Sequence, residues 1–358
     1  MQWIALQWPP EAVPAPCPAA VATTTAPGQE PRRAPDEAPG WWALQFTPRV
    51  AQVDEVLLLE VSASLRLWGG LRALGQRIEA ENPAPPIIWQ APAAIGLVAL
   101  AQLRLRAAGQ ALPPPAALPE ALPLEALSAA RPHLQLLARL GCRSWGQAHA
   151  LPRAGLVRRC GPALRAALDV AFGLTPESYP WLVAPEQFDQ QLDLHTHVDN
   201  APALLWAAAR LLAALQHWLR ARQLGVLALE LAWTLDLKRL DGQPLLPGQA
   251  LVVRTVQPAQ AMEHLRRLLA ERLARVQLLA PAVQLRLRAL ETAPWQVASH
   301  SLLPDEERRA GDPLHMFIER VSARLGPGQV LAVESVADHR PEQRQRWRPA
   351  GCCPNRCR

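Results

Sequence analysis

An acidic turn between two apolar runs is the feature that most constrains the fold of this chain. It lies within TPRVAQVDEVLLLEVSASLRLWGG, which begins at residue 47. The runs 49–53 and 56–62 are rich in valine and leucine, which is typical of strands. They predict a β-hairpin that carries two acids, Asp54 and Glu55, near its turn. The Gly-Gly pair that follows predicts the start of a helix.

The first 110 residues predict a small α+β layer with one low-complexity loop. Residues 9–40 are rich in proline, alanine and threonine, a composition that buries too little apolar surface to offset the entropy of ordering, so we expect a flexible loop. We expect strands at 3–8 and 87–90 and helices at 69–80 and 93–108. The alternation of strands and helices favours a layered domain.

Charge and cysteine content limit the class of protein. The formal net charge is +6 and the pI is near 9.5. Lys238 is the only lysine, so the positive charge is almost entirely arginine. Guanidinium groups suit contacts with phosphate. The six cysteines predict no disulfide framework in a chain of this length. The N-terminus lacks the basic region of a signal peptide, and no uncharged apolar run reaches about 18 residues. We therefore expect a cytoplasmic protein with no membrane partner.

The middle of the chain predicts a Pro-rich linker at 111–130 and a helical domain at 131–179. Within 131–173, short helical segments alternate with glycines, and seven arginines stand against one acid, Asp169. The arginines are Arg131, Arg139, Arg143, Arg153, Arg158, Arg159 and Arg165. Small helices joined by glycine turns are typical of a helix-hairpin-helix unit, in which backbone N–H groups can hold a phosphate. A plain helical domain with a solvated arginine face fits equally well.

A second linker, 180–188, leads to a domain at 189–296 with the order strand, helix, strand, strand, helix, strand. The expected strands are 190–198, 226–235, 250–256 and 282–289, and the expected helices are 203–223 and 259–276, with Pro258 at the start of the second. Residues 297–358 predict a loop, a helix at 315–325 and an arginine-rich tail.

The last strand of that domain predicts two different faces. Val283, Leu285 and Leu287 alternate with Gln284, Arg286 and Arg288. If helices cover the apolar face, the arginines lie on an open sheet surface, joined by Arg254 from a neighbouring strand. This surface is either a platform for a phosphate backbone or an ordinary solvated face.

This order of domains resembles a Y-family translesion DNA polymerase, and more narrowly the ImuB branch, the polymerase-like subunit of a bacterial inducible mutasome. The resemblance covers roughly 41–347 and is carried by WWALQFTPRV, LLLEVSASLRLWGG, LARLGCRSWGQAHALPRAGLVRRCG and LVVRTVQPAQAMEHLRRLLAERLARVQL. It implies a multidomain α+β fold of partial palm, helix-hairpin-helix thumb and little finger. It also implies that palm and fingers are shortened at the N-terminus and that the C-terminus is truncated.

Polymerase chemistry of this family needs carboxylates that hold two divalent metal ions. The resemblance places one acid at the end of the first strand, but WIALQWPP has none before Glu11. In the hairpin, matching Glu60 to the family's later Asp puts Glu55 on the catalytic Asp and Val56 on the catalytic Glu. A shift of one residue puts Asp54 and Glu55 there instead. The first register needs no gap and is preferred.

The residues expected to meet the triphosphate are replaced as well. Ala93, Ala94 and Val98 stand where the family carries Asn and Lys. We therefore assign no catalytic and no metal-binding residues, and we take Asp54, Glu55 and Glu60 as vestigial candidates. No cofactor is expected; Mg²⁺ is required only if the chain is an active polymerase.

The leading hypothesis is a non-catalytic, DNA-binding adaptor of error-prone translesion synthesis, acting in DNA repair and in SOS-induced mutagenesis. The alternatives are an active error-prone polymerase and a degenerate product with a compromised palm. As the resemblance implies, the partners are damaged or primer-template DNA, a replicative-type error-prone polymerase and a RecA-like accessory protein; no convincing clamp-binding peptide is present. The predicted DNA-binding residues are Arg139, Gly141, Arg143, Arg153, Arg158, Arg159, Arg254, Arg286 and Arg288.

Overall fold

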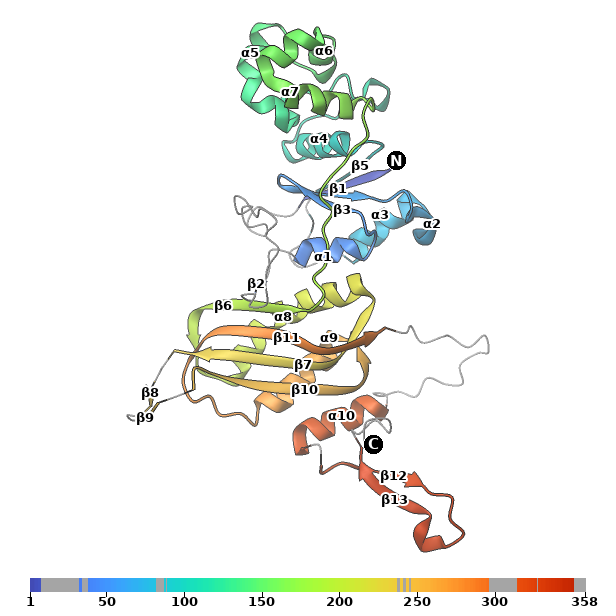
Figure 1. Cartoon of the computed structure of the whole chain (residues 1–358), viewed down its shortest axis with the longest axis vertical. Coiled ribbons are helices and arrows are strands. Elements are labelled where there is room, and N and C mark those ends of the chain that lie inside the picture. The colour runs from blue at the N-terminus through green and yellow to red at the C-terminus, as the bar shows by residue number, and fades with distance from the viewer. Residues whose placement is uncertain are drawn as a thin grey trace. The chain divides into compact units, whose positions relative to one another are not determined.

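A computed structural model describes residues 1–7, 32–33, 38–81, 87, 89–236, 239–240, 243–244, 246–295, 314–326 and 328–350. The chain forms two compact units (Figure 1). Unit 1 contains Met1–Thr23 and Trp42–Val183, and unit 2 contains Thr24–Trp41 and Ala184–Arg358. Most of the loop predicted at 9–40 lies outside the described residues, as does the end of the tail from residue 351.

Unit 1 is built on an antiparallel sheet of four strands with the order β3-β4-β1-β5. The strands are β1 (Trp3–Gln7), β3 (Val50–Val53), β4 (Val56–Glu60) and β5 (Trp89–Ala93). The predicted hairpin is confirmed as β3 and β4. Val53 pairs with Val56, which leaves Asp54 and Glu55 as a two-residue turn.

Helices bury both faces of this sheet. α1 (Ala38–Leu44), α2 (Leu65–Trp68) and α3 (Leu71–Ala80) contribute to a core on one face, where Leu57 and Leu59 point. α4 (Gly96–Ala107) covers the other face, where Val56 and Leu58 point. Every residue of β4 is buried for this reason, which explains the uninterrupted apolar run Val56–Leu59.

The rest of unit 1 is a helical region with its own core. It comprises the short 3₁₀ turns η1 (Pro115–Ala117), η2 (Leu124–Ala126) and η3 (Ser128–His133) and the helices α5 (Leu134–Arg139), α6 (Trp145–His149) and α7 (Arg153–Ala171). Leu122, Leu124 and Leu127 are buried in this core beside Trp145. The stretch 111–130, expected as a linker, is thus an integral part of the helical core, since its leucines pack inward between prolines that suit 3₁₀ turns.

Glycines bend this region where the sequence predicts them to. Gly141 adopts a φ of +78° after α5, and Gly161 adopts the same φ inside α7, where the helix is kinked before Pro162. These left-handed conformations carry no steric penalty in glycine. Ser144 then caps α6 in a capping box with Gln147. α5 and α6 are thus two short helices joined by a turn at Gly141.

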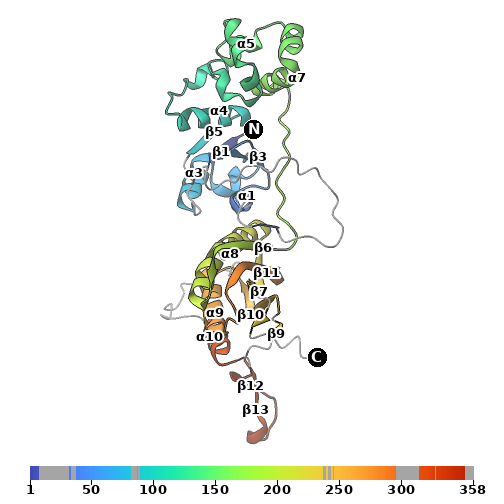
Figure 2. The same ribbon diagram turned by 90° about the vertical axis from the view of Figure 1, so that its left-hand side faces the viewer.

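Unit 2 contains the predicted order of strands and helices. The elements are β6 (Asp189–Val198), α8 (Ala201–Arg222), β7 (Leu224–Leu235), β10 (Gly248–Ala259), α9 (Met262–Leu273) and β11 (Ala282–Pro294). The sheet order is β10-β7-β11-β6-β2, in which β2 (Arg32–Arg33) pairs parallel to β6 and the other neighbours are antiparallel. α8 and α9 lie on the same side of the sheet (Figure 2), and no described helix covers its other face.

Some boundaries in unit 2 differ from the predictions. Pro258 lies in β10 rather than at the start of α9, and β11 continues to Pro294. β8 (Arg239–Leu240) and β9 (Gln243–Pro244) form a short ladder between β7 and β10.

After the sheet, α10 (Leu314–Leu325) packs on α9 and β10, where buried Glu319 pairs with His264 and accepts a hydrogen bond from the Val256 N–H. The tail forms an unpredicted hairpin of β12 (Leu331–Ser335) and β13 (Gln345–Pro349), with η4 (Pro341–Gln343) between its strands. Among the helices that the structure describes, none is long and apolar enough to cross a membrane.

Candidate nucleic-acid interface and acid turn

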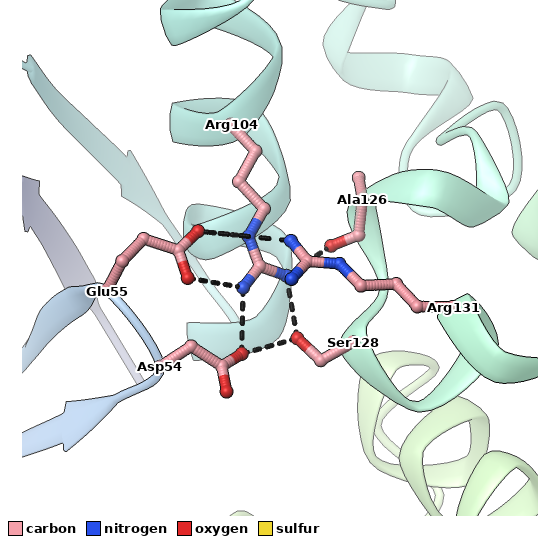
Figure 3. A network of polar contacts seen from close by, with 6 residues as sticks. All are labelled: Asp54, Glu55, Arg104, Ala126, Ser128 and Arg131. Atoms are coloured by element: carbon pink, nitrogen blue, oxygen red, sulfur yellow. Dashed lines mark hydrogen bonds and ion pairs between the residues drawn. The ribbon is translucent and has the colours of Figure 1, made fainter. Parts of the chain in front are cut away.

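The acid turn, which consists of Asp54 and Glu55, is held by an arginine from α4 (Figure 3). Arg104 donates from Nε to Glu55 Oε1 at 2.7 Å and from Nη2 to Asp54 Oδ2 at 2.7 Å and to Glu55 Oε2 at 3.0 Å. Asp54 adopts a left-handed φ of +52°, a conformation that Asp tolerates in tight turns. One guanidinium therefore contacts both carboxylates of the turn.

Arg104 also ties the turn to the helical region. Its Nη1 donates to the carbonyl oxygen of Ala126 and to Ser128 Oγ, both at 2.8 Å, and the Ser128 hydroxyl donates in turn to Asp54 Oδ2. Arg131 approaches Glu55 Oε1 at 4.0 Å (Figure 3). The Arg104 side chain is only 9% exposed. Nothing in the local sequence marks Arg104 as a partner of this turn, because it lies about 50 positions beyond Asp54 and Glu55.

The electrostatics of this cluster favour the charged forms of all three side chains. Burial raises the pKa of Asp54, but the hydrogen bonds from Ser128 and Arg104 outweigh it, and the pKa lies below its ordinary value. Burial acts in the same way on Glu55, where the hydrogen bonds from Arg104 lower the pKa. Burial lowers the pKa of Arg104, but its bonds to Glu55 and Asp54 raise it above the usual value.

Glu60 lies at the opposite end of β4 and takes no part in this cluster. It is 3% exposed, and its carboxylate accepts hydrogen bonds from Arg49 Nη1 at 3.3 Å and from the Ser62 N–H at 3.0 Å. Five residues along a strand separate Glu60 from Glu55 by roughly 17 Å. The three predicted acids therefore do not converge. Within the described ranges, no group of three His, Cys, Asp or Glu residues could hold a metal ion.

The end of β1 carries an amide where an active relative would carry an acid. β1 runs antiparallel to β4 with Leu6 opposite Leu57, so Gln7 lies toward the end of β4 that adjoins the acid turn. Gln7 Oε1 is buried, and no described residue donates a hydrogen bond to it. The position is therefore neutral.

The N-terminus of α4 is occupied by a carboxylate of the same chain. The backbone N–H groups of Gly96 and Leu97 donate to the two oxygens of Glu177 at 2.9 and 3.1 Å. The Tyr179 hydroxyl donates to Glu177 Oε1 at 2.9 Å, and burial, together with this carboxylate, raises the Tyr179 pKa. The positive end of a helix dipole attracts anions, and Glu177 fills that place beside Val98.

The thumb arginines, a term used here for Arg139, Arg143, Arg158 and Arg159, are all exposed. No acid among the residues described lies within 4.0 Å of any of them. Arg153 differs: it is 69% exposed but pairs with Asp169 Oδ2 at 3.0 Å. Asp169 is buried and also accepts from Arg165 Nε at 2.9 Å, so Asp169 is the hub of a structural ion-pair cluster.

The backbone of the α5–α6 hairpin is not available to a phosphate in this structure. The Gly141 N–H donates to the Ala138 carbonyl oxygen at 3.0 Å, and the Cys142 N–H donates to the Leu137 carbonyl oxygen at 2.9 Å. The N–H groups of Arg143 and Ser144 donate to the side chain of Gln147. Contact with phosphate would therefore fall to the arginine side chains rather than to the Gly141 backbone.

The sheet arginines of unit 2, Arg254, Arg286 and Arg288, lie on the face that no described helix covers, as predicted. Each of them is paired with an acid. Arg286 donates from Nε to Asp189 Oδ1 at 2.7 Å, and a second bond joins Nη2 to Oδ2. Arg288 Nε donates to Glu230 Oε2 at 2.7 Å, and Arg254 Nη1 donates to Glu291 Oε1 at 2.9 Å. The sequence pattern identified the arginines and their face but not these acids.

The chain is similar in sequence to a known bacterial protein. No protein-family model matches it. It is 29% identical over 312 residues to Protein ImuB from two strains of Caulobacter vibrioides, across 84% of this chain and 65% of the relative. The chain is thus similar in sequence to Protein ImuB over most of its length. It spans just under two thirds of the length of the curated relatives that it matches.

The ImuB-like chain also aligns with solved Y-family structures. A Dbh ternary complex matches 80% of this chain and 98% of its own, with 13% identity and a TM-score of 0.33. DinB from Sulfolobus solfataricus matches 70% of this chain and 76% of its own, with 12% identity and a TM-score of 0.28. The predicted α+β class is confirmed by the helices and strands of the ImuB-like chain itself.

Proposed function

We infer that this ImuB-like chain is a non-catalytic, DNA-binding adaptor of error-prone translesion synthesis. The observation that carries the proposal is Arg104, whose guanidinium occupies both carboxylates of the acid turn. A two-metal site needs carboxylate oxygens that are free to coordinate cations. Here the oxygens nearest to the vestigial site already accept hydrogen bonds from an internal cation.

The remaining groups around the acid turn support the same function. Gln7 supplies a neutral amide on the neighbouring strand, and Glu60 is too far away to complete a metal site. Glu177 places a negative charge on the N-terminus of α4, near the residues that the resemblance assigns to the triphosphate. A nucleoside triphosphate would have to displace this carboxylate or be repelled by it.

DNA binding is assigned to the thumb arginines. Guanidinium groups without an acid partner can contact phosphates at little cost, and such contacts position a protein on DNA without reading its sequence. If all four contact phosphates, the logarithm of affinity should fall with the logarithm of salt concentration with a slope of about −3.6, since each contact contributes about 0.9.

The proposed biological setting follows from the resemblance. The chain would act in the cytoplasm in DNA-damage-induced mutagenesis, as part of the SOS response, and would hold damaged or primer-template DNA. Its proposed protein partners are a replicative-type error-prone polymerase that performs the chemistry and a RecA-like accessory protein.

A primer-extension assay with Mg²⁺ or Mn²⁺ tests the non-catalytic part of the proposal. We expect no extension, and no difference between the wild type and Glu55→Ala. Extension by the wild type that Glu55→Ala abolishes would show that the acid turn is catalytic and would overturn the proposal.

Fluorescence anisotropy with a labelled primer-template at several salt concentrations tests the DNA-binding part. We expect the variant in which all four thumb arginines are alanine to bind more weakly and with a shallower salt slope. The matched control removes four exposed arginines from other helices: Arg66, Arg72, Arg210 and Arg266. Equal losses in the two variants would mean that only net charge matters, which would contradict the assignment to the thumb.

A further inference from the structure

We propose that three acids, called the screening acids below, hold the sheet arginines away from DNA phosphates and so weaken the binding of unit 2 to DNA. The screening acids are Asp189, Glu230 and Glu291. The inference rests on the proposed DNA-binding function and adds a regulating element to it. It begins with the strand register, which brings each arginine to its acid across the open face.

Arg288 stands directly opposite Glu230 across the β11–β7 pair. Arg286 reaches diagonally along β6 to Asp189, two residues from its direct partner Gln191. Such direct and diagonal neighbours on one face of a sheet are within reach of long side chains.

The third pair spans three strands. Arg254 on β10 and Glu291 on β11 both stand opposite Ala228 of the intervening β7. The small side chain of Ala228 lets the arginine and the acid meet above it, with a separation of 2.9 Å between Nη1 and Oε1. The register therefore produces a row of arginine–acid pairs across the exposed surface.

The charge of these pairs is consequently not that of a phosphate platform. Besides the screening acids, Asp193 accepts a hydrogen bond from Gln284 Nε2 at 2.8 Å on the same face. Three sheet arginines thus stand against four acids, a balance of −1 for these seven residues. A phosphate that approaches an arginine also approaches its acid, and like charges repel.

Burial does not explain the screening, because the pairs are accessible. The side chains of Arg286 and Asp189 are 34% and 32% exposed, and those of Arg254 and Glu291 are 60% and 29% exposed. Arg288 and Asp189 also line a cavity of about 490 Å³ together with Arg222. DNA can reach these arginines, but it must replace a carboxylate that already satisfies them.

This exchange has a measurable signature. An arginine that leaves a carboxylate for a phosphate produces little net release of counterions, so it adds little to the salt slope. Replacing each carboxylate with its amide removes the charge but keeps the size of the side chain. Each arginine freed in this way should steepen the slope by about 0.9.

The test compares Asp189→Asn/Glu230→Gln/Glu291→Gln with a control of equal charge change. The control is Glu81→Gln/Glu263→Gln/Glu334→Gln, whose acids also pair with arginines but lie away from the open face. Primer-template affinity is measured against salt concentration in the full chain. In roughly 0.1 M salt we expect the screening-acid variant to bind DNA at least about eightfold more tightly than the control, which is the effect of one freed arginine–phosphate contact. The salt slope should be steeper by about 0.9 if one arginine is freed and by about 2.7 if all three are.

A second comparison protects the test against misfolding. Arg286→Ala/Arg288→Ala should change affinity little in the wild-type background and should remove most of the gain in the screening-acid variant. An equal gain in the charge-matched control, or no gain in a screening-acid variant whose hydrogen exchange in β7 and β11 is native, would overturn the screening. If the screening is overturned but the thumb-arginine variant still loses DNA binding, only the proposal about the screening acids is wrong. If the wild type and all variants fail to bind DNA, the proposed function itself is wrong.

Discussion

Replacing Arg104 with alanine should destabilise unit 1 by more than any ordinary surface arginine would. Removing one partner of a buried ion pair typically costs about 3–5 kcal/mol, because the remaining charge is left without compensation. Asp54 and Glu55 are 40% and 39% exposed, so water can replace part of what they lose. The Ala126 carbonyl also loses a donor. Together these terms predict a loss of about 2–3 kcal/mol in the free energy of unfolding.

Arg106 offers a matched control on the same helix. Its Nη1 donates to the Gln90 carbonyl oxygen, and it pairs with no acid in the part of the chain that the structure describes. Arg106→Ala should therefore cost about 1 kcal/mol, the value of one hydrogen bond. Because the chain has two units, urea unfolding should be followed by hydrogen exchange in peptides that cover β3, β4 and η3, so that the transition of unit 1 is observed separately.

The effect of Arg104→Ala should also depend on pH. The pKa values of Asp54 and Glu55 in the folded chain lie below their ordinary values of 3.8 and 4.5. The unfolded chain therefore binds protons first as the pH falls, so the stabilisation by Arg104 is complete above about pH 4.5 and is lost as the pH falls through the lowered values. The difference between wild type and variant should be constant from pH 7 to 5 and should shrink below pH 4.

Two results would refute this account of Arg104. The first is a loss of stability no larger than that of Arg106→Ala. The second concerns Asp54→Asn/Glu55→Gln: this change should reduce the cost of Arg104→Ala, because it removes the two uncompensated charges. If the cost is the same in both backgrounds, the ion pairs contribute nothing and the acid turn is held by other contacts.

Three further predictions concern other parts of the chain. Gly141→Ala should destabilise the α5–α6 turn by about 1 kcal/mol, because Gly141 has a φ of +78° that alanine adopts only with strain. Gly155→Ala in α7 should not destabilise the chain, because open space surrounds Gly155. Thermal unfolding of both variants checks this prediction. Burial lowers the pKa of His217 from 6.5 to about 4, so unit 2 should lose stability as the pH falls from about 6.5 toward 4. Urea titrations at pH 7 and 5 measure this loss, and His217→Leu should make it smaller. Glu319→Ala should speed hydrogen exchange throughout α10, because it removes the carboxylate that joins this helix to buried His264 and to the Val256 N–H; unchanged exchange would exclude this anchor.

The hairpin of unit 1 illustrates how far the sequence alone could be taken. Its two strands and the following helices were predictable because short apolar runs flank turn residues. The register of the hairpin was not predictable, because β4 is buried on both faces. Its unbroken apolar run Val56–Leu59 has no periodicity that could decide between the two possible alignments. The structure places Asp54 and Glu55 together in the turn, and its backbone register confirms neither family alignment by itself.

The charged surfaces illustrate what a one-dimensional pattern omits. Alternation along β11 correctly predicted that Arg286 and Arg288 share a face, because it depends on one strand only. Their acids belong to β6 and β7, and that pairing is set by the register of three strands, which no local pattern reveals. The same holds for 111–130, where prolines suggested a linker while Leu122 and Leu124 supplied the core.

Arg104 and Glu177 are two charged side chains of opposite sign in unit 1. Each lies where the resemblance predicts a bound ligand of the same sign. Arg104 brings a cation to the acid turn, and Glu177 brings an anion to the N-terminus of α4. Carboxylates left unpaired beside a sheet are costly, and so are helix N–H groups without an acceptor. Arg104 and Glu177 therefore give the carboxylates of the acid turn and the N–H groups of α4 partners within the chain. On this reasoning Arg104 and Glu177 both stabilise the fold of unit 1.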